Sequence, residues 1–213
     1  VTIEGARNFI SEWGEIIVRD RNHPSIITWT PWNETADTRD MKQHRRLHID
    51  TYNICKRLDP TRPVNDASGY LHHITDIWTV HNYNQNPEEL RETLTPNEER
   101  GVWRNIPNHE SDYDGQPYII DEYGGIKWIS SEDRVFADNS WGYGDAPESL
   151  EEFYTRLEAL TDVILEQAHI AGYCYTQLTD VEQEQNGVYN YDRTEKFDMS
   201  RVAAVFSKEP EAY

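Results

Sequence analysis

The chain has 213 residues, of which 28% are charged and 37% are hydrophobic, and its formal net charge is −19. This length and composition are typical of one globular domain with a sizeable core. The acidic excess argues against nucleic-acid binding, which needs a basic face, and against attraction to anionic membrane surfaces. We therefore expect neither a nucleic acid nor a membrane among its partners.

The sequence also disfavours membrane-spanning and disulfide-stabilised proteins. No apolar run reaches the length of a membrane span, and we expect no signal peptide. The two cysteines, Cys55 and Cys174, are too few for a disulfide framework, and we expect both to be buried thiols. The compartment is not fixed by the sequence, and a cytoplasmic location is favoured.

The spacing of apolar residues predicts helices that alternate with strands. Residues 6–20 and 38–58 carry apolar stripes with helical spacing, and a β-branched run at 25–32 lies between them. The later elements, in chain order, are strands near 63–66 and 76–83, a helix near 87–94, a strand at 117–122, a helix at 147–169 and a strand at 170–177. This alternation implies parallel strands joined by crossover helices.

Two of the predicted strands end in a glutamate. The run at 25–32 leads into Asn33-Glu34, and the strand at 117–122 ends in Asp121-Glu122. A β/α barrel places its chemistry at the C-terminal tips of its strands, and a pair of carboxylates there is suited to cleaving glycosidic bonds. The alternative is that both are ordinary glutamates in a chain with 39 acidic residues.

Four motifs follow one another along the chain. They are Asn22-His23-Pro24-Ser25-Ile26-Ile27 with Trp32-Asn33-Glu34 downstream, Leu58-Asp59-Pro60-Thr61-Arg62-Pro63-Val64, Pro117-Tyr118-Ile119-Ile120-Asp121-Glu122-Tyr123-Gly124, and Tyr175-Thr176-Gln177-Leu178-Thr179-Asp180-Val181-Glu182. In this order they resemble motifs of glycoside hydrolase family 2, and the match covers nearly the whole chain. That family contains β-galactosidases, β-glucuronidases and β-mannosidases.

The resemblance implies an α/β fold that is a partial TIM (β/α)8 barrel, roughly strands 4 to 8 with helices 3 to 7. The strand before Glu34 would be the fourth, and the strand before Glu122 the seventh. Residues 1–213 would form the C-terminal part of the catalytic domain, without the N-terminal strands and the β-sandwich domains of the family. Open barrel edges would then allow a homo-oligomer to form by strand pairing.

The resemblance also assigns roles to particular residues. Glu34 would be the acid/base and Glu122 the nucleophile of a retaining hydrolysis of a carbohydrate substrate. Tyr83 would contact the nucleophile carboxylate, although a packed tyrosine at the top of the barrel is the alternative. The amide of Asn33 can bind the sugar 2-hydroxyl, although an asparagine that forms a turn is also open.

Three further residues are expected to bind substrate. For His81, a substrate contact and a satisfied polar group are equally open. Asp66 follows the fifth strand of the barrel, and Trp128 lies in a loop where its ring can stack on a sugar. No His/Cys cluster has zinc spacing, so we expect no metal site built by this chain and no cofactor.

The sugar preference is less well defined. Some members of the family carry a tryptophan in the eighth strand, and the corresponding stretch here is Tyr175-Thr176-Gln177, without tryptophan. The Asn-x-Lys motif that the glucuronidases carry after this strand is not found. Hydrolysis of terminal β-glycosides of the β-galactosidase kind is therefore favoured. The alternative is a non-catalytic carbohydrate-binding or scaffolding fragment, because residues 1–213 alone are expected to be inactive without the rest of the barrel.

Overall fold

The structure is a computed structural model that describes residues 2–35, 40–129 and 139–210. It divides into two compact units. Unit 1 comprises residues 1–81 and 104–119, and unit 2 comprises residues 82–103 and 120–213. Within the described residues, no helix combines the length and the apolar character that a membrane crossing requires.

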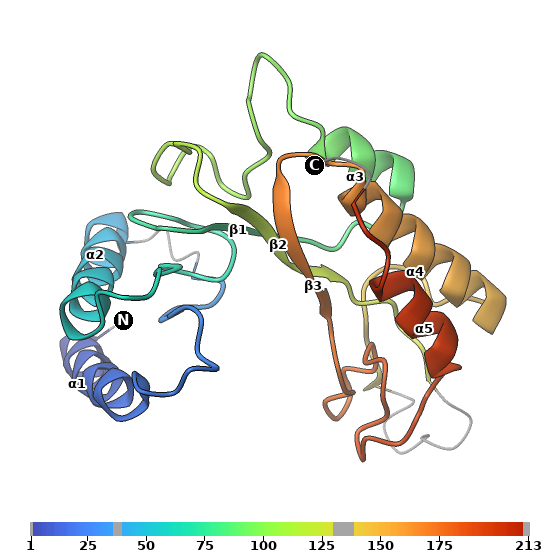
Figure 1. The fold of residues 1–213 in the computed structure, drawn as a ribbon, viewed down its shortest axis with the longest axis horizontal. Coiled ribbons are helices and arrows are strands. Elements are labelled where there is room, and N and C mark those ends of the chain that lie inside the picture. The colour runs from blue at the N-terminus through green and yellow to red at the C-terminus, as the bar shows by residue number, and fades with distance from the viewer. Residues whose placement is uncertain (1, 36–39, 130–138, 211–213) are drawn as a thin grey trace. The chain divides into compact units, whose positions relative to one another are not determined.

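The described part of the chain contains two helices followed by strands and helices in alternation (Figure 1). They are α1 (Ile3–Asp20), α2 (Met41–Leu58), β1 (Trp78–Asn82), α3 (Pro87–Leu94), β2 (Tyr118–Gly124), α4 (Leu150–Leu165), β3 (Ile170–Thr176) and α5 (Met199–Phe206). The three strands form one parallel sheet in the order β1-β2-β3. This arrangement confirms the α/β class and is consistent with part of a (β/α)8 barrel.

The structure confirms the elements expected from residue 76 onward, with shifted boundaries. Helix α4 begins at Leu150, later than the expected residue 147, because Ser149 is its N-cap and accepts a hydrogen bond from the Glu152 amide at 3.2 Å. Helix α5 was not expected. It has eight residues, so its apolar stripe, which buries Val202 and Val205, is too short to be distinctive.

The run at 25–32 forms no regular strand, and neither does the segment at 63–66. They pair only through isolated parallel bridges, Trp29 with Val64 and Asn33 with Ser68. The Trp29 amide donates to the Pro63 carbonyl at 3.2 Å, and the Asn65 amide donates to the Trp29 carbonyl at 2.9 Å. The next bond of a parallel ladder would need an amide hydrogen on Pro31, which proline lacks, so the ladder stops there.

The core of unit 1 lies between α1, α2 and the segment that precedes Glu34. Helices α1 and α2 pack side by side (Figure 1). Ile17, Trp29, Cys55 and Val64 form a fully buried cluster, and partly buried side chains such as Trp13 surround it. This packing confirms that Cys55 is a buried thiol and fixes the segment that leads to Asn33-Glu34.

The core of unit 2 lies on α4, which packs against α3, α5 and β3 (Figure 1). The ring of Phe153 on α4 stacks on Phe197 with 4.0 Å between ring centroids. The expectation that Cys174 is buried is wrong, because the structure leaves this residue exposed. Cys174 lies on β3, the end strand of the sheet in the described residues, and faces away from the core.

A buried ion pair joins two parts of the segment that follows β3, at Asp180 and Lys196. Lys196 Nζ lies 2.7 Å and 2.8 Å from the two oxygens of Asp180, and the Gly187 amide donates to the same carboxylate at 2.8 Å. The side chains of Lys196 and Asp180 are 0% and 1% exposed. Removal of one partner therefore leaves an uncompensated charge in the interior.

We expect Lys196→Met to lower the free energy of unfolding by about 3–5 kcal/mol, because Asp180 would remain buried without its cation. Urea denaturation followed by circular dichroism measures this change. The control is Lys208→Met, since Lys208 pairs with Glu158 and Asp162 but is 32% exposed, and exposed pairs contribute only about 0–1 kcal/mol. Equal losses in the two variants would contradict the expectation.

Candidate active site

Glu34 lies at the end of the broken strand pair, in a conformation that side chains other than glycine rarely adopt. Its φ is 49°, in the left-handed region, which costs about 1–3 kcal/mol for such a residue. Its amide donates to the Ser68 carbonyl at 3.0 Å. The strain is therefore held in place by pairing with the neighbouring segment, and it leaves the carboxylate 38% exposed.

His81, at the end of β1, holds the carboxylate of Glu34. Its Nδ1 lies 2.7 Å from Glu34 Oε1, and its side chain is 2% exposed. In the tautomer whose Nδ1 donates to this carboxylate oxygen, Nε2 accepts from Ser68 Oγ at 3.0 Å. Oε1 of Glu34 is thus engaged by His81.

Gly69 makes room for the ring of His81. Its φ is +65°, and a Cβ added there would lie 2.5 Å from His81 Cδ2. A residue with a side chain would both strain the backbone and displace the imidazole from Glu34. The glycine therefore belongs to the support of the site.

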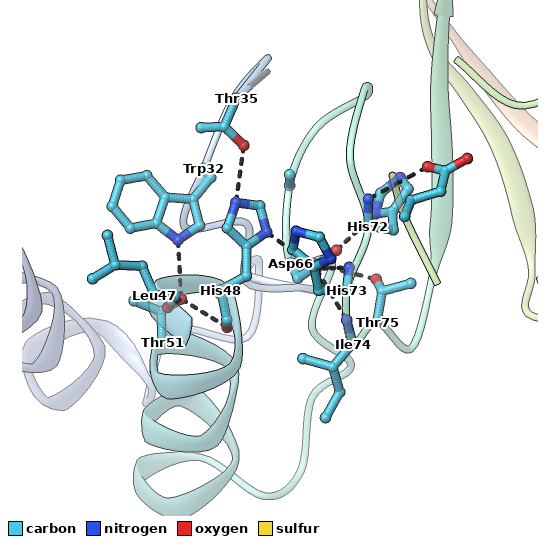
Figure 2. Close-up of polar contacts among 12 residues, drawn as sticks. Trp32, Thr35, Leu47, His48, Thr51, Asp66, His72, His73, Ile74 and Thr75 are labelled. Atoms are coloured by element: carbon cyan, nitrogen blue, oxygen red, sulfur yellow. Dashed lines mark hydrogen bonds and ion pairs between the residues drawn. The ribbon is translucent and has the colours of Figure 1, made fainter. Parts of the chain in front are cut away.

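His48, on α2, contacts both neighbours of the Asn33-Glu34 pair (Figure 2). Its Nε2 lies 2.9 Å from Thr35 Oγ1, and its ring stacks on Trp32 with 5.9 Å between centroids and 10° between planes. Sequence reasoning did not identify His48 or Thr35 because nothing in the local pattern indicates which helix supports the loop. The regular spacing of His44 and His48 on one face of a helix was the available signal.

Asp66, which we expected to bind substrate, is instead enclosed by protein donors. It is 0% exposed, and Figure 2 shows it between His48 and His72. Its oxygens lie 3.2 Å from His48 Nδ1 and 2.7 Å from His72 Nδ1, and they accept from the amides of His73 and Ile74 at 2.7 Å and 3.2 Å. Its carboxylate orients the imidazole of His48 and is closed to a ligand.

The electrostatics of this cluster shift the pKa values of Asp66, His72 and His73. Burial raises the pKa of Asp66, but the hydrogen bonds from His48 and His72 outweigh burial and hold that pKa well below its usual range. Burial lowers the pKa of His72, but the hydrogen bond with Asp66 overcomes it and the net shift is upward. His73 has no comparable partner on Nδ1, and burial lowers its pKa to about 4.

Glu122 lies near the end of β2, in unit 2, and Tyr83 donates its phenolic hydrogen to Glu122 Oε2. The Oη of Tyr83 also lies 3.2 Å from Thr176 Oγ1, at the end of β3. Burial and the neighbouring Glu122 raise the pKa of Tyr83, so the phenol keeps its proton and remains a donor. One oxygen of Glu122 is thus engaged by Tyr83, as the resemblance implied.

Asn33 and Trp128, the other two residues expected to bind substrate, differ in their exposure. Asn33 is exposed beside Glu34. Trp128 is half-buried, its amide donates to the Gln185 carbonyl at 3.0 Å, and its ring lies 6.5 Å from that of Phe153 on α4. Trp128 therefore packs toward the core of unit 2.

The structure brings together Asn33, Glu34 and His81 in unit 1, and Tyr83 and Glu122 in unit 2. Sequence reasoning missed Thr176, although its place at a strand tip was a usable signal. It also did not associate Tyr143, which stacks on Tyr83 with 3.5 Å between centroids.

The family model described as "Glycosyl hydrolases family 2, TIM barrel domain" matches residues 4–208. The β-galactosidase of Photobacterium profundum is 29% identical over 119 residues, which are 55% of this chain and 10% of that protein. The β-galactosidase of Oenococcus oeni is 31% identical over 109 residues, 51% of this chain and 9% of that protein. The chain thus spans about a tenth of the length of the curated relatives it matches.

Solved structures show the same fold at lower identity. A β-glucuronidase from an uncultured Clostridium superposes with a TM-score of 0.68 at 15% identity, over 95% of this chain and 36% of that one. A β-galacturonidase from Eisenbergiella tayi superposes with a TM-score of 0.68 at 21% identity, over 94% of this chain and 36% of that one.

Proposed function

The chain belongs to glycoside hydrolase family 2, and we propose that Glu34 and Glu122 cleave a terminal β-glycosidic bond with retention in the complete protein that contains it. The observation that carries this proposal is that a neighbouring side chain holds one oxygen of each glutamate: His81 contacts Oε1 of Glu34, and Tyr83 donates to Oε2 of Glu122. His81 and Tyr83 are separated by one residue of chain. The reaction would use the other oxygen of each carboxylate.

In the first step, Oε1 of Glu122 attacks the anomeric carbon, and Glu34 gives its proton to the leaving oxygen. The glycosidic C–O bond breaks as the new ester bond forms, so the product is a glycosyl-enzyme and a free alcohol. Tyr83 stabilises the ionised nucleophile before attack and remains on the ester carbonyl oxygen afterwards. Asn33, exposed beside Glu34, binds the sugar 2-hydroxyl.

In the second step, Glu34 acts as a base. Its carboxylate takes a proton from water, the water oxygen attacks the anomeric carbon, and the bond to Glu122 breaks. The sugar leaves with the configuration it had in the substrate. His81 remains the donor to Oε1 of Glu34 throughout, so the proton is lost from and returned to Oε2.

A β-galactoside is the substrate that we propose. The curated relatives that match this chain at 29% to 31% identity are β-galactosidases, whereas the uronidase structures share 21% identity or less and inform only on the fold. The absence of an Asn-x-Lys motif in the sequence also disfavours a uronic acid, whose carboxylate needs a cation partner.

We further propose that residues 1–213 are the C-terminal part of the barrel and need the rest of it for activity. In this proposal the three strands and the two bridged segments would take five of the eight strand positions of a complete barrel. A site assembled from many strand tips needs most of them in place. The match covers only 10% of the relative's length. A non-catalytic sugar-binding role is therefore the second candidate.

A panel of nitrophenyl β-glycosides on the complete protein tests the function. We expect the galactoside to be hydrolysed faster than the glucuronide and the mannoside, and NMR to detect the β-anomer of the sugar first. The α-anomer as first product would exclude retention. Binding of galactosides without hydrolysis of any glycoside would favour the non-catalytic candidate.

A further inference from the structure

A row of aromatic rings leads away from Glu122 within unit 2. Tyr83 donates to Glu122, and Tyr143 stacks on Tyr83 with 3.5 Å between centroids and 2° between planes. Trp141 meets Tyr143 edge to face, at 5.9 Å and 79°. Trp141 is thus the outer end of a continuous aromatic row that begins at the proposed nucleophile.

The backbone holds this row firmly. The Trp141 amide donates to the Gln183 carbonyl at 2.8 Å, and the Gln185 amide donates to the Trp141 carbonyl at 3.0 Å. The Tyr143 amide donates to the Gly125 carbonyl at 2.9 Å. Gly125 has a φ of +62°, and a Cβ there would lie 2.4 Å from Tyr143 Cδ2, so the close approach of Tyr143 requires glycine. Residues that follow β2 and β3 therefore hold the backbone of Trp141 and Tyr143 in place.

Trp141 is exposed in spite of this fixed placement. It is 42% exposed, whereas every other tryptophan of the described residues is buried or half-buried. Burial of a large aromatic side chain normally stabilises the folded protein. A ring that is held rigidly but left open offers binding surface at a low cost in conformational entropy.

We propose that Trp141, supported by Tyr143, is a stacking platform for a ring of the substrate beside Glu122. The ligand chemistry is a flat, weakly polar ring face, either the pyranose itself or a ring attached through the glycosidic oxygen. This subsite rests on the proposed function and adds to it a residue that contributes binding energy. It also replaces Trp128, which packs toward Phe153, as the sugar-stacking tryptophan.

Three variants of the complete protein test the platform: Trp141→Ala, Trp141→Phe and, as a control, Tyr191→Ala. Tyr191 is another aromatic residue of unit 2 and is 60% exposed. The probes are phenyl and methyl 1-thio-β-galactoside, whose sulfur link resists hydrolysis, and binding is measured by calorimetry. Hydrolysis of nitrophenyl β-galactoside gives kcat and KM for the same variants.

We expect Trp141→Ala to raise the Kd for the phenyl probe and the KM for the nitrophenyl substrate about tenfold, with a much smaller change in kcat. Trp141→Phe should recover most of the affinity, and Tyr191→Ala should behave as wild type. A loss confined to the phenyl probe assigns the platform to the leaving group, whereas equal losses with both probes assign it to the sugar.

Unchanged affinity of Trp141→Ala for both probes would overturn the platform and leave the proposed function intact. So would a loss of affinity that Tyr191→Ala shares equally, since that would reflect a general defect. Conversely, wild-type protein that binds the probes through Trp141 but hydrolyses no glycoside would refute the proposed function and retain the platform. The two proposals can therefore fail separately.

Discussion

The Glu122→Gln variant of the complete protein is expected to lose roughly 10⁴-fold or more of its kcat on nitrophenyl β-galactoside. The amide is nearly the same size as the carboxylate, and Tyr83 can still donate to its oxygen. It carries no negative charge, however, and cannot form the glycosyl ester. Steady-state kinetics and the absence of a burst of nitrophenol measure the effect.

Asp121→Asn is a matched control for this variant. Asp121 precedes Glu122 on β2, so the same change from acid to amide is made one residue away, on the opposite side of the strand. We expect Asp121→Asn to keep activity within about tenfold of wild type, as is usual for a residue outside the chemistry. If the two variants lost activity equally, the nucleophile would have to be another residue.

Helices α1 to α4 and strands β1 to β3 could be predicted because each one carries its own repeating pattern. The stripe that buries Ile17 in α1 and the run at 117–122 that becomes β2 are local signals. The pairing of 25–32 with 63–66 is not local. The β-branched run was visible, but whether its ladder continues depends on which carbonyl faces Pro31, and that is fixed only by the partner segment.

In the candidate site, too, the residues with a local sequence signal were predicted, and those that depend on non-local contacts were not. Glu34 and Glu122 were found because strand tips and family motifs mark single positions in the chain. The resemblance also placed Tyr83 beside Glu122. The more remote supporting residues were not found, because His48 reaches Thr35 from α2, and Tyr143 reaches Tyr83 from a position some sixty residues later. Such contacts have no periodicity in the sequence. Asp66 was assigned to substrate because it follows a strand, whereas its histidine partners enclose it completely.

The Glu34→Ala variant should separate the two steps of the reaction. Removal of the proposed acid/base is expected to lower kcat/KM by about 10²–10⁴-fold on a methyl or sugar leaving group, which must be protonated as it departs. An activated nitrophenyl group leaves without that proton, so its glycosylation step should be affected far less. Comparison of kcat/KM for methyl and dinitrophenyl β-galactosides measures this difference.

Sodium azide provides an independent readout of the same residue. With Glu34 replaced by alanine, water lacks its general base, and the glycosyl-enzyme on Glu122 should accumulate. Azide is a strong nucleophile that needs no base, and the missing side chain leaves it room, so it should restore turnover and yield a β-glycosyl azide. In Glu122→Gln no glycosyl-enzyme forms, and azide should not give this product. If Glu34→Ala were equally slow on both leaving groups and azide changed nothing, another residue would supply the proton, and the strained conformation of Glu34 would need a different explanation.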